Sequence, residues 1–198
     1  MKKILLAVLA ASTALVAMPA SAQTVTGTVN ITGSVAPKCQ VVPTGGGGVS
    51  STFTANVALG ELSDPDGTLV SSASLSTLFN AGGTGAAILT FRVVCTTAQP
   101  GVSVDADPIV NVATAPAGYA NRVDYQADVL FDLVPSATDQ TVSNDSAAAL
   151  TTTSLNDRLV GAGNNVTITA QNFRTPSATD IMVAGSYNGL ITVVISPS

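Results

Sequence analysis

The 198-residue sequence contains no histidine and no tryptophan. Without histidine there is no Ser-His-Asp or Cys-His arrangement and no imidazole to act as a general base, so we do not expect an enzyme. The chain also has no C-x-x-C pair, and with histidine absent too, a metal site is disfavoured. We therefore expect neither a cofactor nor a bound metal ion.

Charged residues are also scarce, at 10% of the sequence. Beyond residue 22 there are five basic and twelve acidic residues, a net charge of −7. A sparse and acidic surface argues against nucleic acid or anionic lipid as a partner. The abundance of Thr, Ser, Ala, Gly and Val indicates a β-rich protein whose low charge gives little protection against strand association. That property suits a subunit that assembles.

The first 22 residues have the pattern of a removable secretory signal. Lys2 and Lys3 precede an apolar run over residues 4–18, and small residues follow at 19–22. The run is too short to cross a bilayer, and no later segment of the sequence is apolar for long enough either. We expect export through the inner membrane, a mature chain starting near Gln23, and passage through the periplasm to the cell surface.

Two cysteines remain, Cys39 and Cys95. In an exported protein an even pair predicts a disulfide bond. A disulfide bond that closes a loop of this length is expected to stabilise the fold by about 4 kcal/mol in the chain-entropy model.

The mature chain opens with a strict two-residue alternation over residues 24–35. One face carries Val and Ile with two glycines, and the other carries Thr, Asn and Ser. This period predicts a β-strand with one buried side. The strand either belongs to this molecule's own sandwich or is donated to a neighbour. The apolar face consists of Val25, Gly27, Val29, Ile31, Gly33 and Val35.

Further alternating runs separated by turn residues predict an antiparallel, immunoglobulin-like sandwich. We predict strands over 53–59, 86–97, 102–106, 122–134, 166–170 and 187–196, and a short helix near 75–79. A loop is expected over 43–48 and a turn over 64–67. Asp107-Pro108 is expected to end its strand. Asp105 and Asp107 share a strand face. The two residues form either a carboxylate pair or part of a calcium site, or they are simply the solvated end of a strand.

Two of these segments together resemble one protein family. Residues 27–35, followed four residues later by Cys39, look like the amino-terminal region of chaperone–usher pilins, and residues 185–195 are similar to the final strand of those proteins. The likeness is greatest to the spore-coat-protein-U-like branch, which includes archaic-type pilins. The resemblance covers both ends and one interior strand. It departs from the family in the 56-residue spacing of the cysteines, which is longer than usual.

The resemblance implies a sandwich that lacks its last strand, with residues 1–22 as signal peptide, 23–37 as donor-strand extension and 38–198 as the pilin-like domain. The missing strand would come first from a periplasmic chaperone, with an outer-membrane usher, and then from the next identical or related subunit. Val25, Val29, Ile31 and Val35 would enter the neighbour's groove, and Gly27 and Gly33 would allow close approach. The wall of the acceptor groove would be formed by Tyr187, Leu190, Ile191, Val193 and Ile195.

The function expected on this basis is a structural subunit of a bacterial surface pilus or coat that polymerises by donor-strand exchange. Two alternatives stay open: an adhesin or binding module at a fibre tip, and a secreted sandwich whose first strand pairs within its own molecule. A tip adhesin is expected to carry an extra receptor domain, for which this chain has no room. Three tyrosines and no tryptophan also disfavour a carbohydrate-stacking site.

Overall fold

A computed structural model describes residues 26–43, 47–135 and 138–198. Its contacts divide the chain into two units, Met1–Ser34 and Val35–Ser198, and every helix and strand of the described residues lies in the second. These elements are β1 (Cys39–Val41), α1 (Ser72–Asn80), β2 (Thr90–Phe91), β3 (Val93–Cys95), β4 (Gly101–Val110), β5 (Tyr119–Ala120), β6 (Arg122–Phe131), β7 (Gln140–Asp145), β8 (Thr151–Ser154), β9 (Val166–Arg174), β10 (Ile181–Met182) and β11 (Asn188–Ser196).

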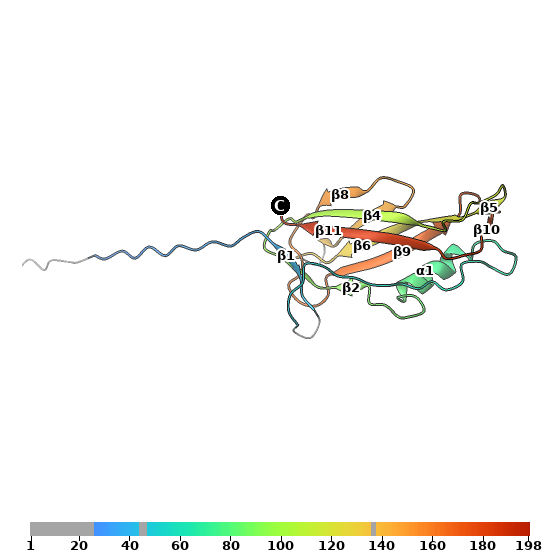
Figure 1. Cartoon of the computed structure of the whole chain (residues 1–198). Coiled ribbons are helices and arrows are strands. Elements are labelled where there is room, and N and C mark those ends of the chain that lie inside the picture. Colours follow the sequence, from blue (N-terminus) through green and yellow to red (C-terminus); the bar gives the residue numbers. More distant parts are fainter. Residues whose placement is uncertain (1–25, 44–46, 136–137) are drawn as a thin grey trace, which may run out of the picture. The chain divides into compact units, whose positions relative to one another are not determined.

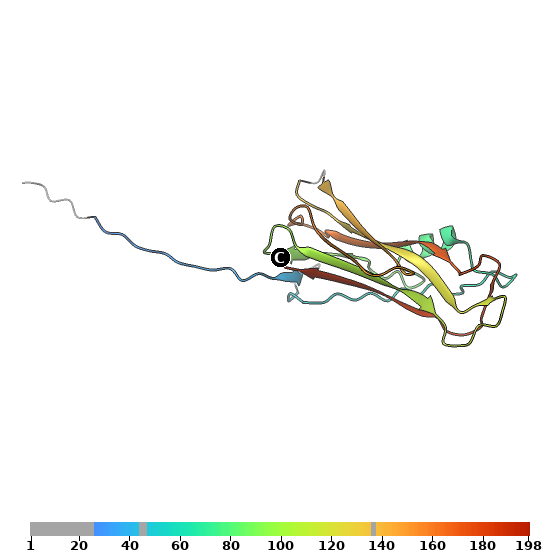
Figure 2. The same cartoon turned by 90° about the horizontal axis from the view of Figure 1, so that it is seen from above.

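The strands of the second unit form two layers that meet at β4 and β6 (Figures 1 and 2). In one layer β4 lies between β8 and β11. In the other, β6 lies between β7 and β9, and β2 follows β9. β4 and β6 pair only through Ile109–Val123 and Val110–Arg122, so the layers separate beyond that point. Among the named strands of the described residues, every pairing is antiparallel except that of the short strands β5 and β10, which is parallel. The predicted all-β, antiparallel class is confirmed in this sandwich-like arrangement.

Alternation along β6 builds most of the core. Its inward side chains are buried almost completely, and β4 contributes a matching inward row from the facing layer. The period of two puts every second residue on one side, as predicted for the run over 122–134. The buried residues of the two strands are Val123, Tyr125, Ala127, Val129 and Phe131 in β6, and Val102, Val104 and Ala106 in β4.

The predicted short helix is present as α1. The Ser71 side chain accepts a hydrogen bond from the Ser74 backbone N–H and caps its first turn. Leu75 and Phe79, four residues apart, are buried on one face. The helix packs on β9, where Asn80 Oδ1 accepts a hydrogen bond from the Ala170 backbone N–H at 3.1 Å.

Two buried asparagines satisfy backbone groups where strand ladders stop. Asn165 accepts from the Val93 N–H at 2.8 Å and donates to the carbonyls of Val93 and Val160, both at 2.7 Å. Asn144 accepts from the Ala106 N–H at 2.8 Å and donates to the Ala149 carbonyl at 2.7 Å. Because buried backbone groups must be paired, these amides stand in for absent strand neighbours.

Two local predictions are wrong. Asp107-Pro108 does not end its strand, because β4 continues to Val110. The register of β4 against β11 shifts at this point, between the partners of Asn188 and Leu190, so the missing N–H of Pro108 falls in an irregular step of the ladder. In the described parts of the chain, the predicted strand over 53–59 forms no ladder and makes only an isolated bridge between Ala58 and Gly83. The predicted loop over 43–48 lies partly outside the described residues.

Replacing Asn165 by alanine should lower the free energy of unfolding by about 3 kcal/mol or more, because two buried backbone groups and one part-buried carbonyl would lose their partner. Asn164→Ala is the matched control. Its neighbouring side chain is exposed and donates one hydrogen bond, to Thr90 Oγ1 at 2.9 Å, so a loss below about 1 kcal/mol is expected. Urea unfolding of the full chain measures both, and equal losses would contradict this role for Asn165.

Candidate functional site

β11 has one paired and one open edge. It pairs with β4 along its length, from Asn188 opposite Val110 to Ser196 opposite Gly101. In the part of the chain that the structure describes, no strand pairs with the other edge of β11. In an antiparallel strand, alternate residues direct their N–H and C=O groups away from the partner, so this edge presents a row of free donors and acceptors.

The inward face of β11 is incompletely covered. Ile191, Val193 and Ile195 pack against the core yet stay half-buried, whereas the inward residues of β4 and β6 are sealed. On the other face, Leu190 and Val194 are 58% and 50% exposed. Of the predicted wall residues, the structure therefore brings Ile191, Val193 and Ile195 together and puts Leu190 on the opposite face. A strand added at the open edge would extend cover over the three half-buried side chains.

Two tyrosines hold the beginning of β11 in place. Tyr187 donates from its hydroxyl to the carbonyls of Ala120 (3.0 Å) and Val183 (2.9 Å). Tyr125 donates to the Leu190 carbonyl at 3.1 Å from within the core. Burial raises the pKa of both phenols, so they remain protonated donors. These hydrogen bonds therefore fix the position of the first residues of β11, where its open edge begins.

An extended segment without partners runs beside β11, on the side away from β4 (Figures 1 and 2). We call residues 53–57 the unpaired segment. Among the described residues, none of its backbone groups makes a hydrogen bond. Phe53 and Val57 nevertheless pack against the core, and the Phe53 ring stacks on Phe91 with centroids 4.2 Å apart. The segment has the side-chain alternation of a strand and lacks the ladder.

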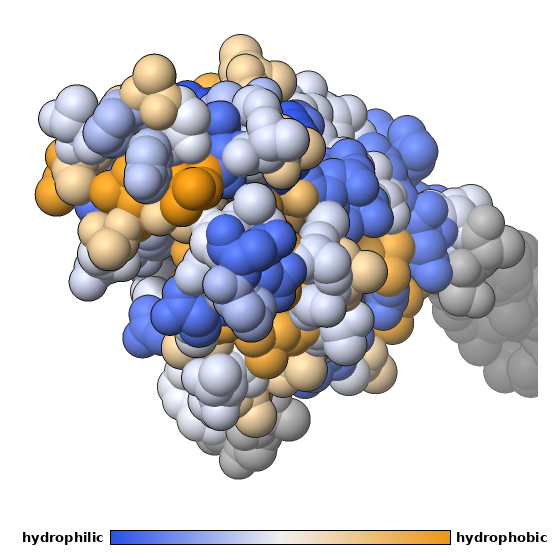
Figure 3. All heavy atoms as spheres, turned by 90° about the vertical axis from the view of Figure 1, so that its right-hand side faces the viewer, coloured by the Kyte–Doolittle hydropathy of each residue, from blue (hydrophilic) through white to orange (hydrophobic). Residues whose placement is uncertain are grey.

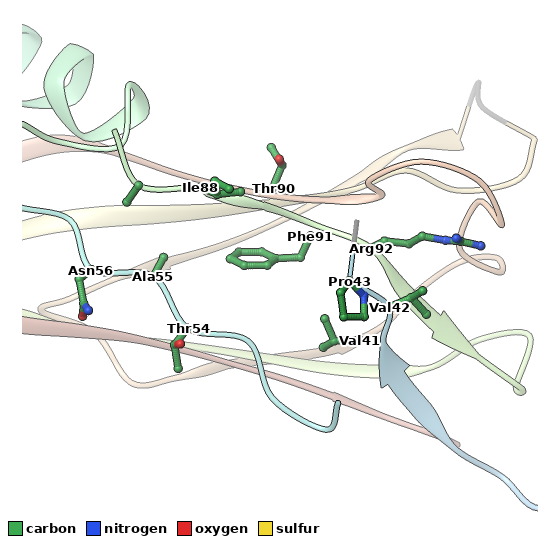
Figure 4. Close-up of a pocket in the computed structure, with 11 residues that line it drawn as sticks. Val41, Val42, Pro43, Thr54, Ala55, Asn56, Ile88, Thr90, Phe91 and Arg92 are labelled. Carbon is green, nitrogen blue, oxygen red and sulfur yellow. The ribbon is translucent and has the colours of Figure 1, made fainter. Parts of the chain in front are cut away.

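A cavity of about 420 Å³ separates the unpaired segment from the strand on its other side (Figure 4). Thr54, Ala55 and Asn56 border it on one side, and Ile88 and Phe91 on the other. Among the described residues, the unpaired segment thus makes no backbone hydrogen bond to β2, from which the cavity separates it, and none to β11 either.

The predicted disulfide is confirmed. Cys39 of β1 and Cys95 of β3 are directly opposite each other, with their Cα atoms 4.1 Å apart. The backbone around them is tied down as well, since the Lys38 N–H donates to Thr96 Oγ1 at 2.9 Å. The point where the amino-terminal segment joins the sandwich is therefore held by a covalent bond.

The predicted donor face lies in the first unit and at its border. Val25 is outside the described residues. Residues 26–38 contain no helix or strand, and Gly27 and Gly33 have nothing near the position a Cβ would take. Val29, Ile31 and Val35 are 87%, 91% and 78% exposed. The apolar face of the alternation is thus open to solvent in the single chain.

The described residues hold no group of three or more His, Cys, Asp or Glu residues arranged to bind a metal. Asp105 and Asp107 both lie on the outward side of β4. Of the helical structure that is described, nothing is long and apolar enough to span a membrane.

The sequence did not reveal that the backbone of the unpaired segment lacks hydrogen-bond partners among the described residues. Their alternation predicts a strand, and no local signal says whether that strand finds a partner. The one available hint is the glycine run at 45–48, which interrupts the chain between β1 and this segment.

No known family model, curated protein sequence or solved structure matches this chain.

The backbone amides of the unpaired segment, residues 53–57, should exchange with deuterium as fast as free peptide, because they have no acceptor. The amides of residues 102–106 in β4, which lies between two strands, should be slowed by about a thousandfold or more. Hydrogen-exchange mass spectrometry of the purified full chain measures both. Equal protection of the two regions would show that the segment is paired in solution.

Proposed function

We propose that this protein is a structural subunit of a bacterial surface pilus or coat, with an immunoglobulin-like sandwich that lacks one strand. Its amino-terminal alternation, residues 24–35, fills the place beside β11 in a neighbouring copy. The observation that carries the proposal is the open edge of β11 facing an extended segment that is itself unpaired. Strand addition satisfies both backbones at once.

The apolar face of the extension is suited to this role. Val29, Ile31 and Val35 are almost fully exposed in the single chain, so nearly all of their surface is available for burial. With Val25 included, four aliphatic side chains at roughly 1.5–3 kcal/mol each give about 6–12 kcal/mol before ordering costs are subtracted. On the receiving side, Ile191, Val193 and Ile195 would lose their remaining exposure.

Such an exchange is directional. The donating and receiving surfaces differ, so each subunit can receive one strand and give one, and the contact does not close on itself. The product is a fibre. An open edge is also an aggregation hazard before assembly, which gives a reason for a periplasmic chaperone to cover it and an usher to exchange it.

Aspartate at the apolar face of the extension should block assembly. Ile31→Asp and Val29→Asp would bury a charge in the neighbour, and polymer is expected to fall at least tenfold. Thr28→Asp and Asn30→Asp place the same charge on the polar face of the same strand and serve as matched controls that should still assemble. The readout is the ladder on a non-boiled gel that collapses on heating.

Three outcomes of this experiment distinguish strand donation from the alternative functions. Loss of the ladder in the first pair alone supports strand donation. A wild-type chain that stays monomeric, with amides 26–35 protected from exchange, would favour a self-contained secreted or tip-located binding module. A ladder unaffected by all four variants would show that the extension is not the joining element.

A further inference from the structure

One end of the sandwich carries an uncovered apolar surface. We call it the far end: the termination of β4, the β5–β10 pair and the start of β11, on the right in Figure 1. Val110, Val112, Tyr119 and Ile181 are exposed there. Figure 3 looks directly at this end and shows orange apolar atoms gathered among polar ones. Beside them lies a shallow hollow of about 420 Å³, lined by Asp107, Pro108, Val110, Asn188, Gly189 and Leu190.

The outward side of β4 next to the hollow is negatively charged without compensation. Asp107 lies opposite Leu190, and Asp105 opposite Thr192. In the part of the chain that the structure describes, the ion pairs are Arg122–Asp124 and Arg174–Asp145, and neither involves these two carboxylates. An uncompensated acid beside exposed apolar side chains fits a partner that brings an apolar group and a cation.

The opposite end of the sandwich carries both an exposed cation and adjacent apolar residues. Lys38 is the only lysine after residue 22, and it follows Ala36 and Pro37 directly. It is exposed, and its side chain takes part in no ion pair of the described residues. Its backbone is fixed, because the Thr96 N–H donates to the Lys38 carbonyl at 2.9 Å. In Figure 1, β1 lies at the end opposite to β5 and β10.

Strand direction brings these two ends together if the proposed function holds, and the inference rests on it. Antiparallel pairing is the more stable geometry per residue. A donor strand antiparallel to β11 finishes, at Val35, beside the Asn188 end, which is the far end. Three residues then span at most about 10 Å, which brings Lys38 of the donating copy within reach of the hollow.

We propose that the far end is a docking surface for a second copy of this chain. Lys38 of the donating copy pairs with Asp107 of the accepting copy, within reach of Asp105, and Ala36 and Pro37 cover the hollow. This contact forms only with the antiparallel direction of the donated strand and adds to the preference for it. A parallel donor would finish beside Ser196, at the other end, where neither carboxylate lies.

A zero-length cross-link tests the contact. Carbodiimide treatment of assembled full-length protein should join the Lys38 amine to Asp107 or Asp105, because it couples only groups already in contact. Mixing isotope-labelled and unlabelled chains before assembly identifies cross-links between copies in the mass spectrum. A ladder whose Lys38 is joined to other carboxylates, or to none, overturns the docking contact and leaves strand donation standing. Absence of any ladder overturns both.

Charge reversal gives a second, independent test. Lys38→Glu and Asp107→Lys should each slow assembly by about two- to fivefold, and the double variant should recover most of the wild-type rate. Asp64→Lys is the control: it makes the same change in net charge at an exposed carboxylate outside the ion pairs of the described residues, and should show no recovery with Lys38→Glu. Equal behaviour of the two double variants would count against a specific Lys38–Asp107 pair.

Discussion

The organisation of the second unit follows from the need of backbone N–H and C=O groups to find partners. Inside the sandwich the need is met by strand ladders and, where ladders stop, by the amides of Asn144 and Asn165. Within residues 26–43, 47–135 and 138–198, it is not met along one edge of β11 or along the unpaired segment. Both are nevertheless held in place by packed neighbours: β11 is paired with β4 along its other edge, and the Phe53 ring of the unpaired segment stacks on Phe91. The unsatisfied groups are therefore held in an ordered array, as the proposed addition of a strand from a neighbouring copy would require.

Much of the fold could be predicted because side-chain alternation is a local property. The buried row of β6, the final strand and the disulfide all follow from patterns within a few residues or from a single pair of cysteines. The hydrogen bonds from the buried asparagine side chains to the backbone could not be predicted. Asn165 and Val93 are 72 residues apart, and in the sequence an isolated asparagine is indistinguishable from a turn residue. The continuation of β4 through Pro108 likewise depends on where the register shifts in a partner strand far along the chain.

The candidate site was predictable only in part, for the same reason. Alternation identifies Ile191, Val193 and Ile195 as one apolar face, and the structure brings them together. It also assigns a strand pattern to residues 53–59, where the structure has almost no ladder. Periodicity tells which face of a segment is apolar. It carries no information on whether a neighbour occupies the segment's edge, which is a property of the whole topology.

The disulfide has a mechanical consequence. Tension applied through the chain ahead of Cys39 passes across the sulfur–sulfur bond into Cys95 and β3. The chain between the two cysteines, which are 56 positions apart and enclose the unpaired segment and α1, then carries no tensile load. Pulling on that terminus therefore cannot peel these elements away one after another. The force passes instead through β3 to β4, the next strand in the chain, which belongs to the two-layered body. The disulfide bond thus protects the chain between Cys39 and Cys95 from unfolding under force at the place where the amino-terminal segment joins the sandwich.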